Sequence, residues 1–144
     1  MPYTDYLDGA LNQMVFGDTA YTVPADLYIA LSTTTPVQAK GTATPYWNFT
    51  EPSGSAYARV TVANNTTNWV AAASQPATGQ EQDNGTAITF PTATGSWGTV
   101  TYFGIFDAAT AGNLLAFGAL TTSQTISSGD TASFAAAALT ITLD

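Results

Sequence analysis

Arg59 is the residue whose type and position most suggest a specific interaction. It lies in the middle of an alternating apolar segment, with bulky neighbours on both sides. A guanidinium in such a place is usually held by a carboxylate or by backbone carbonyls in a charge-assisted pair. No nucleophile stands beside it, so the sequence indicates a structural ion pair rather than catalysis. We predict Asp107 as the partner, with Asp26 and Glu51 as open alternatives.

The acidic residues suggest two further kinds of chemistry. Two carboxylates about 5–9.5 Å apart can hydrolyse glycosides, and clustered Asp and Asn oxygens can bind calcium. The segment Asp83-Asn84-Gly85 lacks the spacing and the distal Glu of a calcium loop. Asp107 and Asp130 fall in predicted turns, where carboxylates hydrogen-bond the backbone. We therefore predict no catalytic residue, no metal site and no cofactor.

A serine-containing segment, Gly95-Ser96-Trp97-Gly98, does not match the G-x-S-x-G motif of serine hydrolases. We interpret its glycines as making room for a large indole at the start of a strand. The chain contains no His and no Cys. Triads, thiol nucleophiles, thiolate metal sites and disulfides are therefore excluded, and we predict a protein that is not an enzyme.

The charge balance limits the partners. Lys and Arg number 2 against 10 Asp and Glu, which gives a net charge of −8. Binding to a phosphate backbone needs several cationic contacts, and the net charge repels nucleic acid and anionic membrane surfaces. The sequence shows no secretion signal and no apolar run of membrane-spanning length. We expect neither a nucleic-acid nor a membrane partner, and we expect an origin in the cytoplasm.

The composition is unusual for a chain of 144 residues, a length that predicts a single domain, residues 1–144. Only 8% of the residues are charged, whereas an average globular chain is about one-quarter charged. Thr and Ala take the place of the charges. A charge-poor surface with 12% aromatic residues can be buried against other subunits without stranding ions. We interpret it as the surface of a protein built to be assembled.

The first segment predicts a helix over residues 4–16. Thr4 can cap its start and Gly17 can end it. Apolar residues recur at helical spacing along one stripe: Leu7, Ala10, Leu11, Met14 and Val15. We predict that this helix closes one end of a β core. The alternative is a docking arm for a partner subunit.

From Asp26 onward the apolar period is two, which is typical of strands. We predict strands over 26–32, 57–62, 66–70, 87–90, 97–106, 114–120 and 131–143, and an exposed loop over 71–85. The segment 97–106 carries bulk on both faces, with Trp97, Phe103 and Ile105 on one and Val100, Tyr102 and Phe106 on the other. The fold class is therefore all-β: an antiparallel β-sandwich, jelly-roll-like or immunoglobulin-like, of about seven to eight strands with one short N-terminal helix.

A long loop over residues 33–55 interrupts the strands. It contains three prolines and the aromatic residues Tyr46, Trp47 and Phe49. Long structureless connections are usually functional or docked. These three aromatic residues are candidate interface anchors, and the alternative is that they fold back as a lid on the sandwich.

Several segments together resemble small virion structural proteins of tailed bacteriophages. They are residues 97–107 and 112–120, residues 27–36, Tyr57-Ala58-Arg59-Val60 and the closing strand after Gly129-Asp130. Members of this group serve as tail-fibre or minor structural proteins, and similar stand-alone proteins decorate the head. The resemblance covers most of residues 26–143 and implies membership of the virion, assembled in the bacterial host cytoplasm.

The leading hypothesis from the sequence is a capsid decoration, or cement, protein. Such a β-sandwich stabilises the head by bridging subunits of the major capsid protein, and the resemblance implies a homotrimer. The alternative is a tail-fibre or baseplate-associated protein that contacts other tail proteins or a receptor on the host surface. Copy number per particle distinguishes the two.

Overall fold

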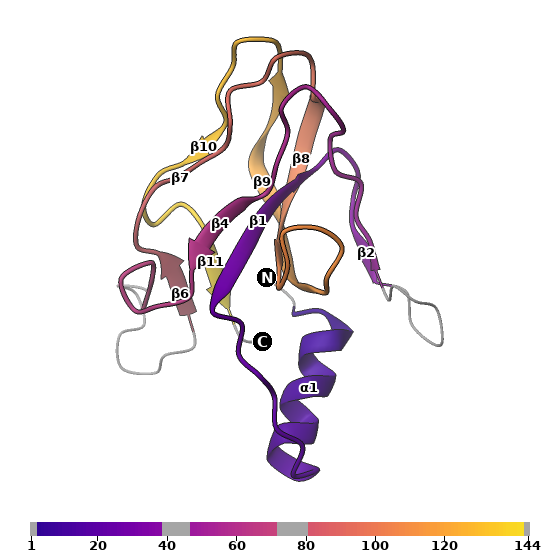
Figure 1. Ribbon diagram of the computed structural model, residues 1–144, viewed down its shortest axis with the longest axis vertical. Coiled ribbons are helices and arrows are strands. Elements are labelled where there is room, and N and C mark those ends of the chain that lie inside the picture. Colours follow the sequence, from indigo (N-terminus) through magenta and orange to yellow (C-terminus); the bar gives the residue numbers. More distant parts are fainter. Residues whose placement is uncertain (1–2, 39–46, 72–80, 143–144) are drawn as a thin grey trace.

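The computed structural model describes residues 3–38, 47–71 and 81–142 (Figure 1). Within these ranges one helix, α1 (Asp5–Phe16), precedes eleven strands. They are β1 (Asp26–Ser32), β2 (Val37–Gln38), β3 (Trp47–Asn48), β4 (Val60–Ala63), β5 (Trp69–Ala71), β6 (Glu81–Asn84), β7 (Ile88–Thr89), β8 (Gly98–Phe106), β9 (Leu114–Ile126), β10 (Ser133–Phe134) and β11 (Thr140–Thr142). The predicted all-β class is confirmed. The strand number exceeds the prediction because several strands are only two or three residues long.

The strands form a sandwich in which every pairing is antiparallel. The main sheet has the order β4-β1-β8-β9, and two smaller sheets, β11-β6-β5 and β10-β7, face it. Figure 1 shows the smaller sheets to the left of the main sheet. One apolar cluster joins the layers, with Ile29 and Ile105 from the main sheet and Ile88, Phe90 and Leu139 from the other side. Burial of this cluster is the main force that holds the layers together.

The helix begins and ends where the sequence predicts. The Thr4 side chain accepts a hydrogen bond from the backbone N–H of Leu7, and Gly17 caps the other end by donating to the carbonyl of Gln13. The Thr4 hydroxyl also donates to the carbonyl of Leu114, and its backbone N–H donates to Leu115. The start of α1 is thus fixed to β9, while the rest of the helix extends away from the sheets (Figure 1).

The predicted faces of segment 97–106 are partly wrong. Val100 belongs to the same buried cluster as Phe103 and Ile105, whereas Phe106 lies in a second cluster. The ladder between β8 and β9 shifts register between Val100 and Tyr102. Between these two pairs the extra residues lie in β9, since Val100 pairs with Gln124 and Tyr102 with Ala119. Val100 and Phe103 nevertheless belong to the same cluster, so the alternation of β8 is interrupted beside this irregularity.

The second cluster covers the other face of the main sheet. It contains Ala30, Phe49, Phe106 and Leu114. The rings of Phe49 and Phe106 meet edge to face, with centroids 5.3 Å apart. Phe49 belongs to the predicted loop 33–55, which is not structureless, since β2 and β3 pair within it. Strands of two residues are too short to leave an alternating pattern in the sequence, so β2 and β3 could not be predicted within this loop.

Gly104 should tolerate no side chain. A Cβ atom there would lie 2.6 Å from the Phe49 ring and 2.9 Å from Cδ1 of Leu114. We expect Gly104→Ala to lower the free energy of unfolding by about 1–3 kcal/mol, as overpacked cores do. Gly9 in α1 is the matched control, because a Cβ atom there meets nothing within 4 Å. Gly9→Ala should raise stability by about 0.5–1 kcal/mol, and urea unfolding would contradict this account if both variants shifted the midpoint in the same direction.

Candidate functional site

Arg59 is held by Glu51 and not by Asp107, which corrects the predicted pairing. Nη2 of Arg59 lies 2.6 Å from Oε1 of Glu51, and Nε donates to both carboxylate oxygens. Nη1 donates to the carbonyls of Ala108 and Ala111 at 2.8 and 2.9 Å. Only 6% of the Arg59 side chain is exposed. The guanidinium therefore ties the segment after β3 to the turn between β8 and β9.

The ring of Phe106 supports the same guanidinium. The Cζ atom of Arg59 stands 3.6 Å from the ring centroid, in the geometry of a cation–π contact. Arg59 thus covers the Phe106 side of the second cluster. The pairing of Arg59 with a carboxylate and with backbone carbonyls is a structural contact within the sandwich.

The acidic residues flagged from the sequence stabilise turns. Oδ1 of Asp107 accepts the backbone N–H of Asn113 at 2.6 Å, and Oδ2 accepts its side-chain amide at 2.8 Å. Oδ2 of Asp130 accepts the backbone N–H of Ser127. These bonds are the turn contacts predicted for both residues. Asp107 is already used locally, which explains why it is not the partner of Arg59.

The serine-containing segment is also structural. Trp97 is buried, and its indole N–H donates to the carbonyl of Ser55 at 2.9 Å. The hydroxyl of Ser96 accepts the backbone N–H of Gly98. Gly98 has a φ of +79°, a conformation that favours glycine. A Cβ atom at Gly95 would lie 2.6 Å from Oγ of Ser55, so this glycine makes room for the Ser55 side chain, and the predicted role of the glycines in admitting the indole stays a prediction.

Tyr57 extends the contacts of Glu51 into the core. Its hydroxyl donates to Oε2 of Glu51 at 2.9 Å and accepts the backbone N–H of Leu31 at 2.9 Å. Its ring packs edge to face on Trp97. Burial, reinforced by the Glu51 carboxylate, raises the pKa of Tyr57 well above its ordinary value of 10.0. The hydroxyl is therefore neutral in the folded protein.

This shift predicts a loss of stability in alkali. Because the folded-state pKa of Tyr57 is raised, the unfolded chain ionises first as the pH increases. The contribution of the neutral hydroxyl is fully present below about pH 10 and is lost above it. We expect Tyr57→Phe to cost about 1 kcal/mol at neutral pH and to flatten the fall in stability above pH 10. Urea unfolding at several alkaline pH values measures both, and an unchanged alkaline slope in the variant would contradict the assignment.

The three aromatic residues proposed as interface anchors have different outcomes. Phe49 is buried against Phe106, so it takes the second alternative and folds back on the sandwich. Trp47 lies in β3, but its side chain is outside the described residues, as is the whole of Tyr46. Their role as anchors stays a prediction.

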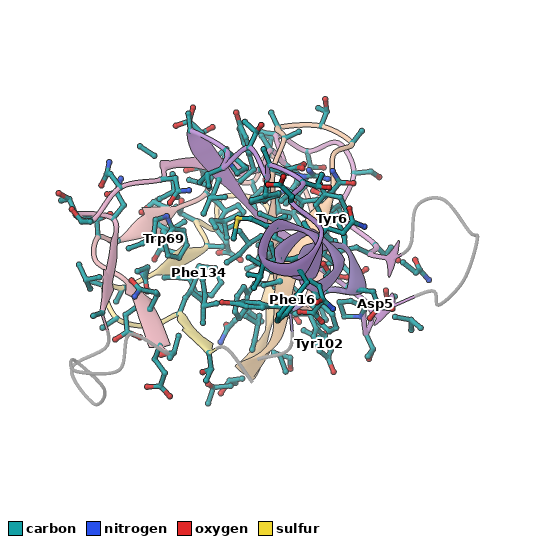
Figure 2. All side chains as sticks on the ribbon, turned by 90° about the horizontal axis from the view of Figure 1, so that it is seen from below. Asp5, Tyr6, Phe16, Trp69, Tyr102 and Phe134 are labelled. Carbon is teal, nitrogen blue, oxygen red and sulfur yellow. The ribbon has the colours of Figure 1, made fainter. Side chains whose placement is uncertain are left out.

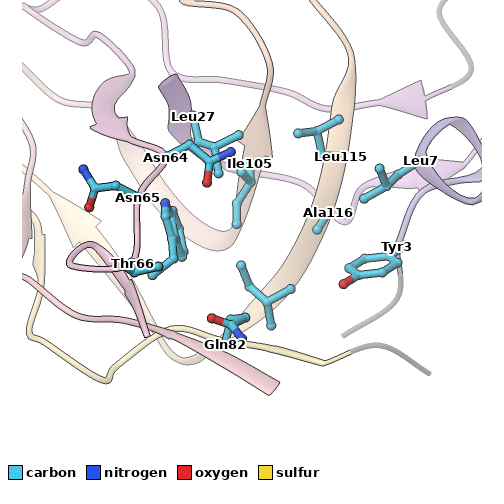
Figure 3. Close-up of a pocket in the computed structure, with 12 residues that line it drawn as sticks. Tyr3, Leu7, Leu27, Asn64, Asn65, Thr66, Gln82, Ile105, Leu115 and Ala116 are labelled. Atoms are coloured by element: carbon cyan, nitrogen blue, oxygen red, sulfur yellow. The ribbon is translucent and has the colours of Figure 1, made fainter. Parts of the chain in front are cut away.

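A mainly apolar recess lies beside the start of α1 (Figure 3). It has a volume of about 460 Å³. Leu7 and Tyr3 border it on one side and Asn64, Asn65 and Thr66 on the other, with the main sheet between them. The indole N–H of Trp69, which also lines it, is buried without a hydrogen-bond partner in the described part of the chain. The recess holds no carboxylate or cation, so its chemistry is that of an apolar contact.

Residues 3–38, 47–71 and 81–142 contain no group of three His, Cys, Asp or Glu residues that could hold a metal ion. Across the same residues, no helix combines the length and the apolar character needed to cross a bilayer.

The far end of α1 is an exposed apolar surface. The helix contains no buried residue. Its apolar stripe contacts the body through Leu7, which borders the recess, and then continues beyond the sheets. Met14 is 44% exposed, Val15 63% and Phe16 85%. Sequence reasoning identified the stripe but missed Phe16, which lies on the other side of the helix. The available signal was the run of three apolar residues, Met14-Val15-Phe16, that ends the helix.

A family model described as podophage GP4 fiber I protein gp80 matches residues 2–142. No curated protein matches the chain. The matched range contains every segment that carries the resemblance to virion proteins of tailed phages. It supports a phage virion structural protein, and its description names a fibre rather than a capsid decoration protein.

Proposed function

The chain belongs to the podophage GP4 fiber I protein gp80 family, whose members are phage virion structural proteins, and from this premise we propose that it is a non-enzymatic component of a phage tail fibre. The observation that carries the proposal is the extent of the match, residues 2–142. The proposal therefore concerns the helix and the sandwich together and does not rest on one shared motif.

The roles of the polar side chains support a structural function. Arg59 and Glu51 hold the β8–β9 turn, and Asp107 and Asp130 stabilise turns. These four side chains are thus engaged in maintaining the sandwich. What the chain presents outward is an apolar helix end and a surface rich in Thr and Ala, which suits contact with other proteins.

Capsid decoration, with the major capsid protein as partner, is the leading hypothesis from composition and surface. The family description instead favours the fibre, with other tail proteins or a host receptor as partners. A homotrimer fits either location, and we retain it as a prediction. Sedimentation velocity of the purified protein is expected to show a trimer, and a monomer at all concentrations would contradict it.

Copy number separates fibre from decoration. Purified particles are divided into tail-containing and tail-less fractions, and the protein is quantified in each against the major capsid protein. A fibre component should follow the tails at a small number of copies per particle. A decoration protein should remain on tail-less heads at an amount comparable with the major capsid protein, and that result would overturn the proposed function.

A further inference from the structure

Exposed large apolar residues are concentrated on α1 and the segment after it. In the part of the chain that the structure describes there are six such residues. Three of them form the end of the helix, which we call the α1 tip: Met14, Val15 and Phe16. A fourth, Val23, is 64% exposed on the segment that returns from α1 to β1. Apolar residues gathered in this way mark an interaction site rather than scattered surface positions.

The α1 tip is presented on a rigid support. Thr4 fixes the start of α1 to β9 through the carbonyls of Leu114 and Leu115. Twelve helical residues span about 18 Å, so the tip stands well beyond the anchored end. Phe16 lies at the end of α1 that points away from the sheets (Figure 2). Since Val15 and Phe16 lie on different sides of the helix, the tip resembles a plug that enters a socket end-on.

The electrostatics of the α1 tip specify the partner. The C-terminal end of a helix carries a partial negative charge, and the last turn of α1 has no basic residue to neutralise it. The Gln13 carbonyl accepts the backbone N–H groups of both Gly17 and Thr19. Asp18 is exposed immediately after the end of the helix. The tip is thus apolar at its centre and negative at its rim.

A second copy of this chain is a poor match for such a surface. Each copy has a net charge of −8 and only two basic residues. One of these, Arg59, is buried in its ion pair with Glu51. Like charges placed against each other disfavour association, whereas a cationic rim would attract the tip and neutralise the helix end.

We propose that the α1 tip is the plug that attaches this protein to a different virion protein, where it enters an apolar socket rimmed by Lys or Arg. The inference rests on the proposed function, because it supplies the attachment that a fibre component needs. It also answers the question left open by the sequence: the first half of the helix contacts the body and the second half is a docking arm.

Incorporation of variant proteins into phage particles tests whether the apolar side chains of the α1 tip make the attachment. A phage encoding Val15→Ser and Phe16→Ser is compared with one encoding Val37→Ser and Val70→Ser, which removes exposed apolar side chains elsewhere. Both proteins should retain the wild-type unfolding midpoint, because all four replaced side chains are exposed. The tip variant should be incorporated about tenfold less or worse, the usual effect of losing an anchoring side chain. Equal incorporation of the two variants would overturn the inference.

The salt dependence of binding to particles tests whether the proposed socket has a rim of Lys or Arg. Purified protein carrying Asp18→Asn is bound to particles that were assembled without this protein. Asn tolerates the positive φ of Asp18, so the variant keeps the backbone. We expect weaker binding than wild type and a flatter dependence on salt. Unchanged affinity and salt dependence would overturn the basic socket.

The outcomes distinguish this inference from the proposed function. Wild-type protein that is absent from tail-containing particles would overturn the proposed function and the inference with it. Wild-type protein that is present, with the tip variant present equally, overturns the inference alone. If the tip variant dissociates an oligomer of the purified wild-type protein in sedimentation, the socket belongs to a second copy, which also overturns it.

Discussion

Replacing Asn84 with Ala should lower the free energy of unfolding by about 4 kcal/mol, the largest loss we expect from a single substitution. Asn84 is fully buried. Its side-chain amide donates to the carbonyls of Thr86 and Ala135, at 2.9 and 2.8 Å, and its oxygen accepts the backbone N–H of Leu139 at 2.8 Å. Ala leaves the buried N–H of Leu139 unpaired and removes one hydrogen bond each from the part-buried carbonyls of Thr86 and Ala135, of which Ala135 keeps the bond from Ala138. The cost is therefore the desolvation penalty of the Leu139 N–H, the net value of the two other bonds and the space left by the buried side chain.

Urea unfolding of Asn84→Ala measures this loss directly. Asn12→Ala, at an exposed position on α1, is the control and should change stability by no more than about 0.5 kcal/mol. Asn84→Asp keeps the size and the acceptor but places a carboxylate against two carbonyls, so it should be as damaging as Ala. A loss below about 1 kcal/mol for Asn84→Ala would show that the bonds of Asn84 do not hold the small sheets together.

Arg59→Ala should cost about 3 kcal/mol. The substitution leaves the partly buried carboxylate of Glu51 without its cation and removes the donors to Ala108 and Ala111. It also uncovers the ring of Phe106. Arg59→Lys keeps the charge but cannot form the two-pronged contact, so an intermediate loss is expected.

A double-mutant cycle shows whether the pair acts as a unit. The loss in the double variant, Arg59→Ala with Glu51→Ala, should be smaller than the sum of the two single losses by about 1 kcal/mol or more, because each single variant strands the other group. Thermal or urea unfolding of the four proteins provides the cycle. Additive losses would mean that the contact of Arg59 with Glu51 contributes nothing to stability.

The elements predicted correctly from the sequence have local signals. α1 combines an apolar stripe with a capping Thr4 and a terminal Gly17, and the structure begins and ends the helix at these residues. β1 and β8 carry alternating or continuous apolar residues. Such patterns reflect burial within the element itself, so they can be read without knowing the partner strands.

The strands that were missed have no such signal. β6 consists of Glu81-Gln82-Asp83-Asn84 and was predicted to lie in a loop, 71–85. It is a strand because β5 and β11 pair with its two edges. The side chain of Asn84 also forms hydrogen bonds with the backbone of Ala135 and Leu139. Pairing of this kind depends on residues far away in the chain. Polar composition alone therefore indicates a loop where the fold makes a strand.

In the candidate site, too, some features could be predicted from local sequence and others depend on residues far away in the chain. That Arg59 is paired could be predicted from its position, but three carboxylates were equally available in the sequence. Two contacts decide which carboxylate pairs with Arg59. The Asp107 carboxylate accepts hydrogen bonds from Asn113, and the segment after β3 places Glu51 beside the guanidinium. Likewise, the stripe of α1 predicted an amphipathic helix, but only the structure shows that its last turn extends past the body.

The location of the protein on the particle tests the central claim most directly. Immunogold labelling of intact purified particles, with an antibody raised against the whole chain, should place the gold at the tail. Tail-less heads prepared from the same phage should remain unlabelled. Gold distributed over the surface of the head, on intact particles and on tail-less heads alike, would contradict the assignment to a tail fibre.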